Sequence, residues 1–247
     1  MKSPIHLRSS MRRHLISRLH TDLRHALLVG RGAATLVQDA IRWQHKEYPR
    51  MERITLPESA VSNTASLVEA LSLRSSENKH APLTSFSLND VSFLFQAARM
   101  RADKTRPYPS GGALYPIETY LFGQVDSFSP SVFHYHPKTH ALERLWELPV
   151  HAGVNDLFFY PEDEAVSPAA AAIVFTAVWE RSATKYGDFA YNLALLEAGH
   201  VAQNMLLLAA AHNINARPMA GFKDSIVSDM LAIDPNNEQA VYSIKFC

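Results

Sequence analysis

The chain has 247 residues and equal numbers of basic and acidic side chains, 24 Lys and Arg against 24 Asp and Glu, so its formal net charge is zero. This balance argues against a dedicated nucleic-acid-binding protein, which normally carries a basic excess that neutralises phosphates. With 47% hydrophobic and 19% charged residues the chain can bury a sizeable core, and the single Cys247 cannot form an internal disulfide, which favours a reducing, cytoplasmic compartment.

The N-terminal segment differs in charge from the rest of the chain. Residues 1–53 hold eleven Lys and Arg but four Asp and Glu, a net charge of +7, so the remainder carries −7. Helical spacing of Leu15, Leu19, Leu23 and Leu27 predicts an amphipathic helix, and a second helix is expected over 33–45. We expect residues 1–55 to be a basic helical segment packed on the body or on a second subunit. Docking to an acidic partner, lying on a membrane surface and acting as a transit peptide are alternatives, and no apolar window predicts a membrane span.

Residues 56–247 form the predicted body. After a connector over 49–63, a helix is expected over 64–73, with Asn63 as its N-cap. A second helix should start at Ser87, since Asp90 completes a capping box. Further strands are predicted over 115–122, 131–136, 141–147, 170–179, 215–222 and 240–246, and further helices over 191–212 and 224–231.

The predicted element order indicates an α+β protein, with helices flanking a mixed β-sheet. The apolar run over 170–179 is typical of a central strand covered on both faces. The helix over 191–212 would be about 33 Å long. Because it is apolar on most sides it must be covered on most sides, which favours a homodimer.

The most specific motif is the stretch RPYPSGGALYPIE over 106–118. Ser110, Gly111 and Gly112 would form a loop whose bare backbone N–H groups can approach a flat or anionic group, and the flanking prolines stiffen it. A tight turn before a strand is the alternative.

This stretch resembles the signature of the SagB-type dehydrogenases, the flavin-dependent azoline oxidases of the nitroreductase superfamily. Three more blocks follow in the order of that family: a hairpin over 132–143, Lys185-Tyr186 with the helical stretch 193–204, and RPMAGF over 217–222. The resemblance runs from Leu67 to Phe246 and implies a nitroreductase-like domain that binds FMN at a dimer interface.

The resemblance also implies roles for individual residues. The loop residues would approach the flavin ring from the partner subunit, two backbone positions would face its redox-active edge, and an Arg-x-Ser motif with a distant lysine would hold the phosphate. Glu77 and Asn78 stand where a second basic residue is common. The implied cofactor contacts are Pro109, Ser110, Gly111 and Gly112 for the loop, Ala220 and Gly221 for the edge, and Arg74, Ser76 and Lys245 for the phosphate.

Lys185 and Tyr186 match the acid–base pair proposed for the family. Oxidation of a thiazoline or oxazoline sends a hydride to the flavin and releases a proton that a protein group must accept. Ordinary lysine and tyrosine have pKa values of about 10, so an apolar environment or a neighbouring charge must activate one of them. The alternative is a surface lysine beside a half-buried tyrosine.

The implied substrate is an azoline-containing precursor peptide, and the implied partners are YcaO-type cyclodehydratase subunits that make the azolines. Two other functions stay open: an NAD(P)H-dependent nitro- or quinone reductase, and a non-catalytic scaffold in the same synthetase complex. Dioxygen is the expected electron acceptor.

We expect no metal site. His134, His136 and His140 place imidazoles on one hairpin, yet the sequence shows no acidic third ligand near them. The Glu-x-x-His pairs Glu197/His200 and Glu77/His80 resemble di-iron motifs, but the second pair lies in a polar stretch and two further glutamates are missing. Glu197 is expected to be a buried, paired carboxylate. It should lie on the same helix face as His200 and Asn204.

Overall fold

The computed structural model describes residues 45–58, 65–149, 153–159 and 169–247. Its core is a seven-stranded sheet in the order β1-β4-β3-β2-β5-β7-β6, and every pairing between these strands is antiparallel. The strands are β1 (Glu52–Thr55), β2 (Ile117–Gly123), β3 (Ser131–His136), β4 (Ala141–Glu147), β5 (Ala171–Val178), β6 (Ala216–Met219) and β7 (Glu238–Phe246). The α+β class is confirmed, whereas the expected mixed sheet is antiparallel, with one isolated parallel bridge between Phe86 and Val125.

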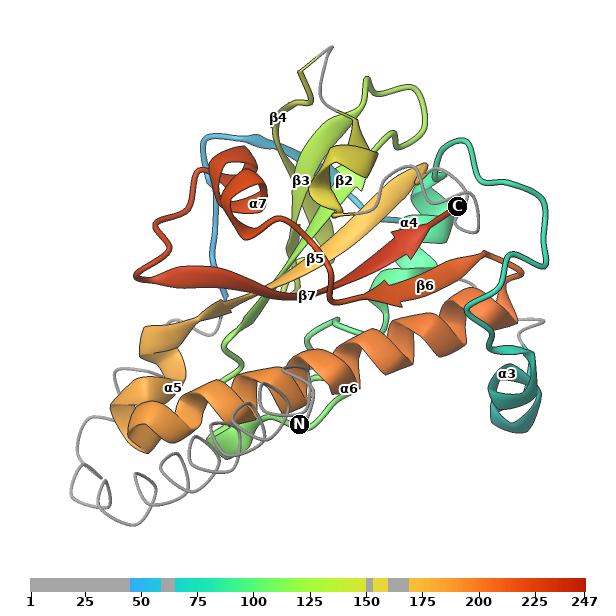
Figure 1. Cartoon of the computed structure of the whole chain (residues 1–247). Helices are drawn as coiled ribbons and strands as arrows, with labels where there is room; N and C mark the ends of the chain where they lie inside the picture. Colours follow the sequence, from blue (N-terminus) through green and yellow to red (C-terminus); the bar gives the residue numbers. More distant parts are fainter. Residues whose placement is uncertain (1–44, 59–64, 150–152, 160–168) are drawn as a thin grey trace, which may run out of the picture.

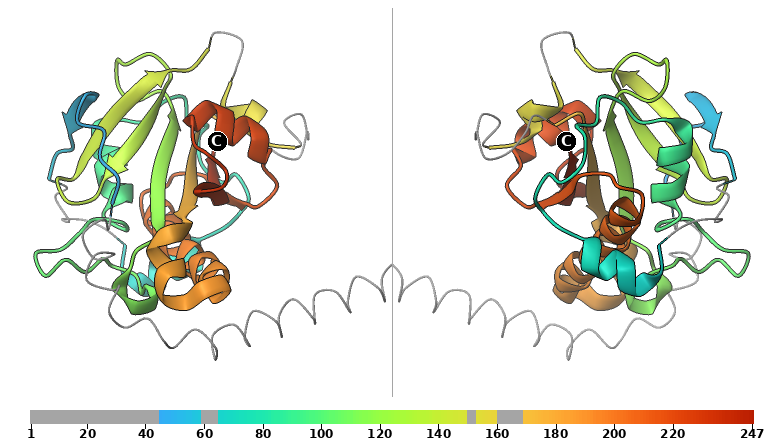
Figure 2. Two further views of the ribbon diagram at one scale, coloured as in Figure 1. Left: turned by 90° about the vertical axis from the view of Figure 1, so that its left-hand side faces the viewer. Right: turned by 90° about the vertical axis from the view of Figure 1, so that its right-hand side faces the viewer.

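The helices lie on both faces of this sheet (Figure 1). They are α3 (Leu67–Leu73), α4 (Leu88–Phe95), α5 (Trp179–Tyr186), α6 (Ala190–Ala211) and α7 (Asp224–Leu231). One core cluster joins α4 and α6 to one face, and a second joins α7 to the other. Figure 2 shows α4 and α7 on opposite sides of the strands. The central strands β2 and β5 are therefore covered on both faces, as the apolar run over 170–179 predicted for β5.

Local capping explains where two helices start. Before α4, the Ser87 hydroxyl accepts a hydrogen bond from the Asp90 amide at 3.1 Å, and the Asp90 carboxylate accepts one from the Ser87 amide at 3.0 Å, which confirms the predicted capping box. Helix α3 begins after Ser66, which forms a second capping box with Glu69. The predicted N-cap Asn63 lies outside the described residues, as do the two helices expected before residue 45.

Two elements had no clear sequence signal. Helix α5 buries Arg181 and Ser182, so its inward face is polar and shows no apolar periodicity. Strand β1 has a mostly exposed, polar sequence because it pairs only with β4 at the edge of the sheet. Residues 52–55, assigned by sequence to the N-terminal segment, thus lie in the sheet of the body.

The stretch Trp179–Ala211 is long and apolar enough to meet the length and hydropathy criteria for a membrane span, and about half of its most apolar window is buried. A core helix passes the same test because several of its sides are covered. Helix α6 contacts β7, β6 and α3, which accounts for its composition.

Candidate functional site

The loop before β2 lies against the end of α5. Gly112 has a φ of 64°, a left-handed conformation that glycine adopts without strain. A Cβ atom at this position would lie 2.7 Å from Tyr186 Oη and 2.9 Å from Lys185 Nζ. The structure therefore brings the predicted loop and the predicted Lys185-Tyr186 pair together within one chain. Both side chains are half-buried, and Lys185 Nζ lies 5.3 Å from the centroid of the Tyr186 ring.

Helix α6 holds this loop at two points. The Ser110 hydroxyl donates a short hydrogen bond to Glu197, and the Tyr115 amide donates to the same hydroxyl at 2.9 Å. Two turns further along α6, Asn204 Nδ2 donates to the Pro107 carbonyl at 3.0 Å. Glu197 and Asn204 lie seven positions apart and so share a helix face, as the sequence predicted.

A buried arginine, Arg106, links the two ends of the loop. Arg106 Nη1 donates to Tyr108 Oη at 2.8 Å and to the Ile117 carbonyl at 3.3 Å. Its guanidinium lies 4.8 Å from the centroid of the Tyr115 ring. The loop is thus fixed from its own ends as well as from α6, and this places Gly112 rigidly beside Tyr186.

Glu197 is almost fully buried, with 2% of its surface exposed. Burial raises the pKa of its carboxyl to about 7, against the opposing effects of the Ser110 hydrogen bond and the positive charge of Arg106. A carboxyl that gains or loses a proton near neutral pH therefore lies directly behind the loop.

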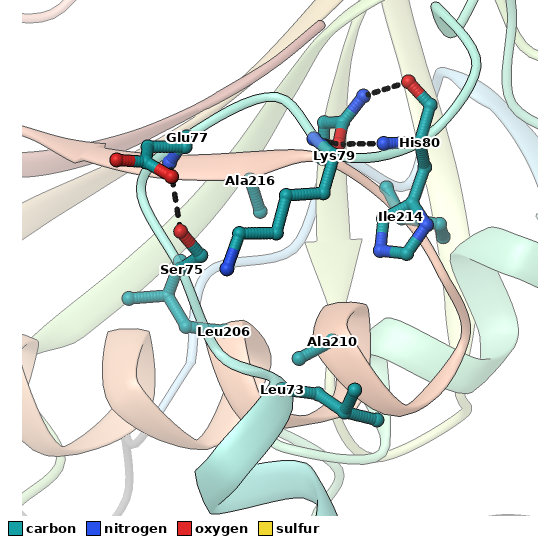
Figure 3. A pocket seen from close by; sticks show the side chains of 10 residues that line it. Leu73, Ser75, Glu77, Lys79, His80, Leu206, Ala210, Ile214 and Ala216 are labelled. Atoms are coloured by element: carbon teal, nitrogen blue, oxygen red, sulfur yellow. Dashed lines mark hydrogen bonds between the residues drawn. The ribbon is translucent and has the colours of Figure 1, made fainter.

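The predicted phosphate-binding residues lie at the other end of α6. Arg74 caps the C-terminus of α3, and its Nη1 donates to Ser76 Oγ at 3.4 Å. Next to them, Ser75 and Lys79 line a shallow pocket together with α6 residues such as Ala210. Figure 3 shows the Lys79 side chain extending across this pocket towards Ser75. Lys79 is thus a cation at this pocket, whereas positions 77 and 78 provide none.

Ala220 and Gly221 follow β6, whose first residue, Ala216, lines the same pocket. A strand advances about 3.3 Å per residue, so Ala220 lies about 13 Å from the pocket wall. A Cβ atom on Gly221 would meet no atom of the described residues within 4 Å. The backbone there consequently has open space above it, as a flat ring would require.

The structure does not bring Lys245 to this group. Lys245 pairs with Ala172 and Arg217 across the sheet and is buried, with its Nζ 6.0 Å from the centroid of the Phe158 ring. Its neighbours Ile244 and Phe246 face α6, so by strand alternation Lys245 faces the opposite side. Its proposed phosphate contact has no geometric support.

A second polar site, which the sequence did not predict, lies under residues 45–48, here called the strap. Glu118 on β2 accepts hydrogen bonds from Arg181, from His134 Nε2 at 2.9 Å and from the Lys46 amide at 2.7 Å. These groups belong to a buried charge network whose other members are Glu143, Glu238, Thr176, Tyr120 and Arg53. Its members are far apart in sequence and lie on apolar strands, so no local motif could have revealed them.

The metal arrangements considered from sequence are not formed by these residues. Both ring nitrogens of His134 bond to carboxylates, and those of His140 bond to Ser92 and Tyr135. On α6, Glu197 is buried whereas His200 is exposed. The Glu77–His80 stretch is irregular, and its Lys79 and His80 amides both donate to Asn215.

Comparisons with known proteins agree with this fold. A family model described as the nitroreductase family matches residues 84–246. The microcin B17-processing protein McbC of Escherichia coli is 34% identical over 139 residues, which cover 52% of this chain and 49% of McbC. The trifolitoxin-processing protein TfxB of Rhizobium leguminosarum bv. trifolii is 26% identical over 184 residues, covering 66% of this chain and 48% of TfxB. The chain therefore matches only about half the length of these two relatives.

A solved structure gives the same fold. The E. coli microcin synthetase McbBCD complex with truncated pro-MccB17 bound contains a chain that superposes with a TM-score of 0.59 at 24% identity, over 86% of this chain and 82% of that one. At this identity the match shows that the two chains share a fold.

Proposed function

Because the chain belongs to the nitroreductase family, we propose that it is an FMN-dependent dehydrogenase that oxidises azoline rings in a peptide to azoles. The observation that carries the proposal is the contact of Lys185 and Tyr186 with Gly112, since it places two groups able to exchange protons beside a bare backbone loop. The similarity to two peptide-processing proteins supports a peptide as the substrate. A YcaO-type cyclodehydratase would supply the azolines, and the work would take place in the cytoplasm.

The residues present fit FMN in two separate groups. Arg74, Ser76 and Lys79 offer donors and cations for a phosphate, and the open backbone at Ala220–Gly221 offers a surface for the ring. When bound, FMN would accept the hydride that an azoline ring gives up.

The Ser110 loop and the Lys185-Tyr186 pair lie too far from the proposed phosphate-binding residues for both to reach one FMN molecule within the same chain. Gly111 lies against Leu193 near the start of α6, whereas the pocket with Ser75 reaches Leu206 and Ala210 near its end. The intervening 13 to 17 residues span about 20 to 25 Å, which is longer than one FMN molecule. A second copy of the chain would have to bring its own loop and Lys-Tyr pair to the flavin, so the proposal includes a homodimer.

Exposed apolar side chains support this dimer. Large apolar residues normally avoid contiguous exposure on a monomer, yet several on α3 and α6 are between 38% and 75% exposed. They are Leu67, Val68, Leu71, Leu73, Tyr191, Leu195 and Leu196.

Within the proposed reaction the chain's own groups handle the proton. The azoline ring loses one hydride and one proton and becomes an azole, so a base must stand beside the ring carbon. Tyr186, with the Lys185 ammonium next to it, is the proposed acceptor. Glu197 does not touch the ring in this scheme; it positions the loop through Ser110.

Mass spectrometry of an azoline peptide incubated with the purified protein tests the proposal. We expect a loss of about 2 Da per ring, the mass of the two hydrogens removed, and release of FMN when the protein is denatured. An unchanged peptide mass together with rapid bleaching of the flavin by NAD(P)H would support a nitro- or quinone reductase instead. A colourless protein that only co-purifies with a cyclodehydratase would support a scaffold.

A further inference from the structure

Three metal-ligand side chains meet where the strap crosses β3. Glu47 Oε1 lies 3.2 Å from His45 Nε2 and 3.3 Å from His136 Nε2, and one ligand atom from each of the three residues lies within 4.8 Å of the others. We propose that His45, Glu47 and His136 bind a divalent transition-metal ion of the zinc class. This site is separate from the flavin groups and independent of the proposed function.

The distances fit a tetrahedral ion. Zinc binds histidine nitrogen and carboxylate oxygen at about 2.0 to 2.2 Å, so two of its ligand atoms lie about 3.4 Å apart. The two edges that meet at Glu47 already have nearly this length. The edge between the ligand nitrogens of His45 and His136 is at most 4.8 Å long, so it would have to shorten by up to about 1.4 Å to match the tetrahedral value.

Burial gives an independent reason for a ligand at this place. His136 is 1% exposed, and neither its Nε2 nor the Nδ1 of His45 has a hydrogen-bond partner of normal geometry. A buried polar atom without a partner destabilises the folded state, since it has lost its hydrogen bonds to water. A metal ion would satisfy His136 Nε2 directly, because this nitrogen would be one of its ligand atoms.

The other nitrogen of His136 has a suitable second partner. A metal-bound neutral imidazole carries its proton on the remaining nitrogen and donates it to a nearby acceptor. Thr139 Oγ1 lies 2.8 Å from His136 Nδ1 and can accept that proton. The Thr139 amide, 3.2 Å from the same atom, donates to the metal-free tautomer, so metal binding would exchange this contact for the one to the hydroxyl.

Charge and access also suit a cation. Two neutral imidazoles and one carboxylate carry a net charge of −1, and Lys46, which lies between the two strap ligands in sequence, directs its ammonium away to Glu238 at 2.6 Å. The Glu47 side chain is 51% exposed, so a fourth ligand position would open to water. Imidazole and carboxylate together favour zinc and its neighbours over calcium or magnesium.

Such an ion would fasten the strap to the sheet. The strap already donates backbone hydrogen bonds to the network, from Lys46 to Glu118 and from Tyr48 to Glu143. The metal would add a third attachment at the point where the basic N-terminal segment joins the acidic body.

Calorimetric titration of the chelator-treated full chain with Zn²⁺ tests the proposal. We expect one ion per chain, and we expect Glu47→Gln and His45→Gln each to weaken binding at least about tenfold. Glu52→Gln and His212→Gln change the same residue types at exposed positions elsewhere and should bind as the parent does. His136→Gln is less suitable as the first variant because the residue is buried.

Thermal unfolding provides the second readout. Zn²⁺ at one hundred times its Kd should raise the Tm of the parent by about 5 to 10 °C, and this shift should be lost in Glu47→Gln. The proposal is overturned if the parent binds no stoichiometric Zn²⁺, or if both ligand variants bind it as tightly as the parent. In that event the three groups form a metal-free cluster in which Glu47 pairs with both histidines.

Discussion

Two buried glutamates illustrate how differently this fold treats a carboxylate. Glu118, in the charge network under the strap, and Glu197, behind the Ser110 loop, are 1% and 2% exposed. Glu118 is surrounded by Arg181, His134 and the Lys46 amide. Glu197 accepts a hydrogen bond from a hydroxyl, and none of the ion pairs among the described residues includes it.

The contrast in partners sets the protonation state of each residue. Burial alone would raise the pKa of Glu118, but the charges of Arg181 and His134 outweigh it and hold the pKa well below its usual range. For Glu197 burial prevails, and the pKa rises to about 7. A buried carboxylate whose negative charge is balanced by neighbouring cations stabilises the fold. One without such partners can gain or lose a proton near neutral pH, beside a reaction site.

The largest expected effect is a loss of activity when the side chains beside the Ser110 loop are changed. Tyr186→Phe and Lys185→Met should lower azole formation about 100-fold to 10,000-fold, since each removes a group that exchanges protons. Both side chains are only half-buried, so the free energy of unfolding should change little. Peptide mass measures the activity, and flavin absorbance shows whether FMN is retained. Full activity in both variants would remove them from the proposed mechanism.

The free energy of unfolding should depend more on the charge network under the strap than on the region behind the Ser110 loop. Glu118→Gln leaves Arg181 buried without its counter-charge and leaves His134 paired with Glu143 alone, and breaking a buried ion pair of this kind costs about 3 to 5 kcal/mol. Glu197→Gln at pH 7 should cost much less, because an amide oxygen can still accept the Ser110 hydrogen bond. Denaturant unfolding of both variants measures the difference, and equal losses would contradict the comparison.

The pH dependence of stability tests the raised pKa of Glu197. Between its ordinary pKa of about 4.5 and the folded value of about 7, the folded chain binds more protons than the unfolded one. The stability contributed by the neutral carboxyl is therefore fully present below about pH 4.5 and is lost as the pH rises to 7, by on the order of 3 kcal/mol in total.

The change in the free energy of unfolding of the parent across this pH range, minus the same change for Glu197→Gln, isolates that contribution.

Glu143 in the network should affect the pH dependence of stability with the opposite sign. Its pKa is lowered to about 2, by hydrogen bonds from His134 and Arg53 that outweigh the effect of burial, so its contribution is lost as the pH falls from about 4.5 to 2. A parent and variant with parallel pH profiles would show that Glu197 titrates normally.

The smallest effect concerns the loop itself. Gly112→Ala would strain a left-handed residue by about 1 to 2 kcal/mol and push against Tyr186 Oη and Lys185 Nζ. Gly111→Ala would meet only the flexible end of Leu193, at 2.9 Å, without a positive φ. We expect Gly112→Ala to lower azole formation more than Gly111→Ala, and equal activities would indicate that the loop does not position the pair.

Sequence reasoning identified the α+β class, the long helix and most element boundaries, since β3, β4 and α7 match their predicted ranges. These features follow from local periodicity and capping, which the chain carries within each segment. The same local signals failed for α5, whose buried face is polar, and for β1, whose edge position demands no apolar pattern.

The sequence by itself, through its resemblance to a known family, indicated the residues of the proposed flavin site: the Ser110 loop, the Lys185-Tyr186 pair and the Arg74-Ser76 motif. Only the tertiary structure decided which of them meet. It joined the loop to the pair, set the phosphate residues at the far end of α6, turned Lys245 to the other face of the sheet and placed Glu47 between His45 and His136. The physical reason is that the packing of strands and helices, which depends on the whole core, fixes distances between residues that are remote in sequence.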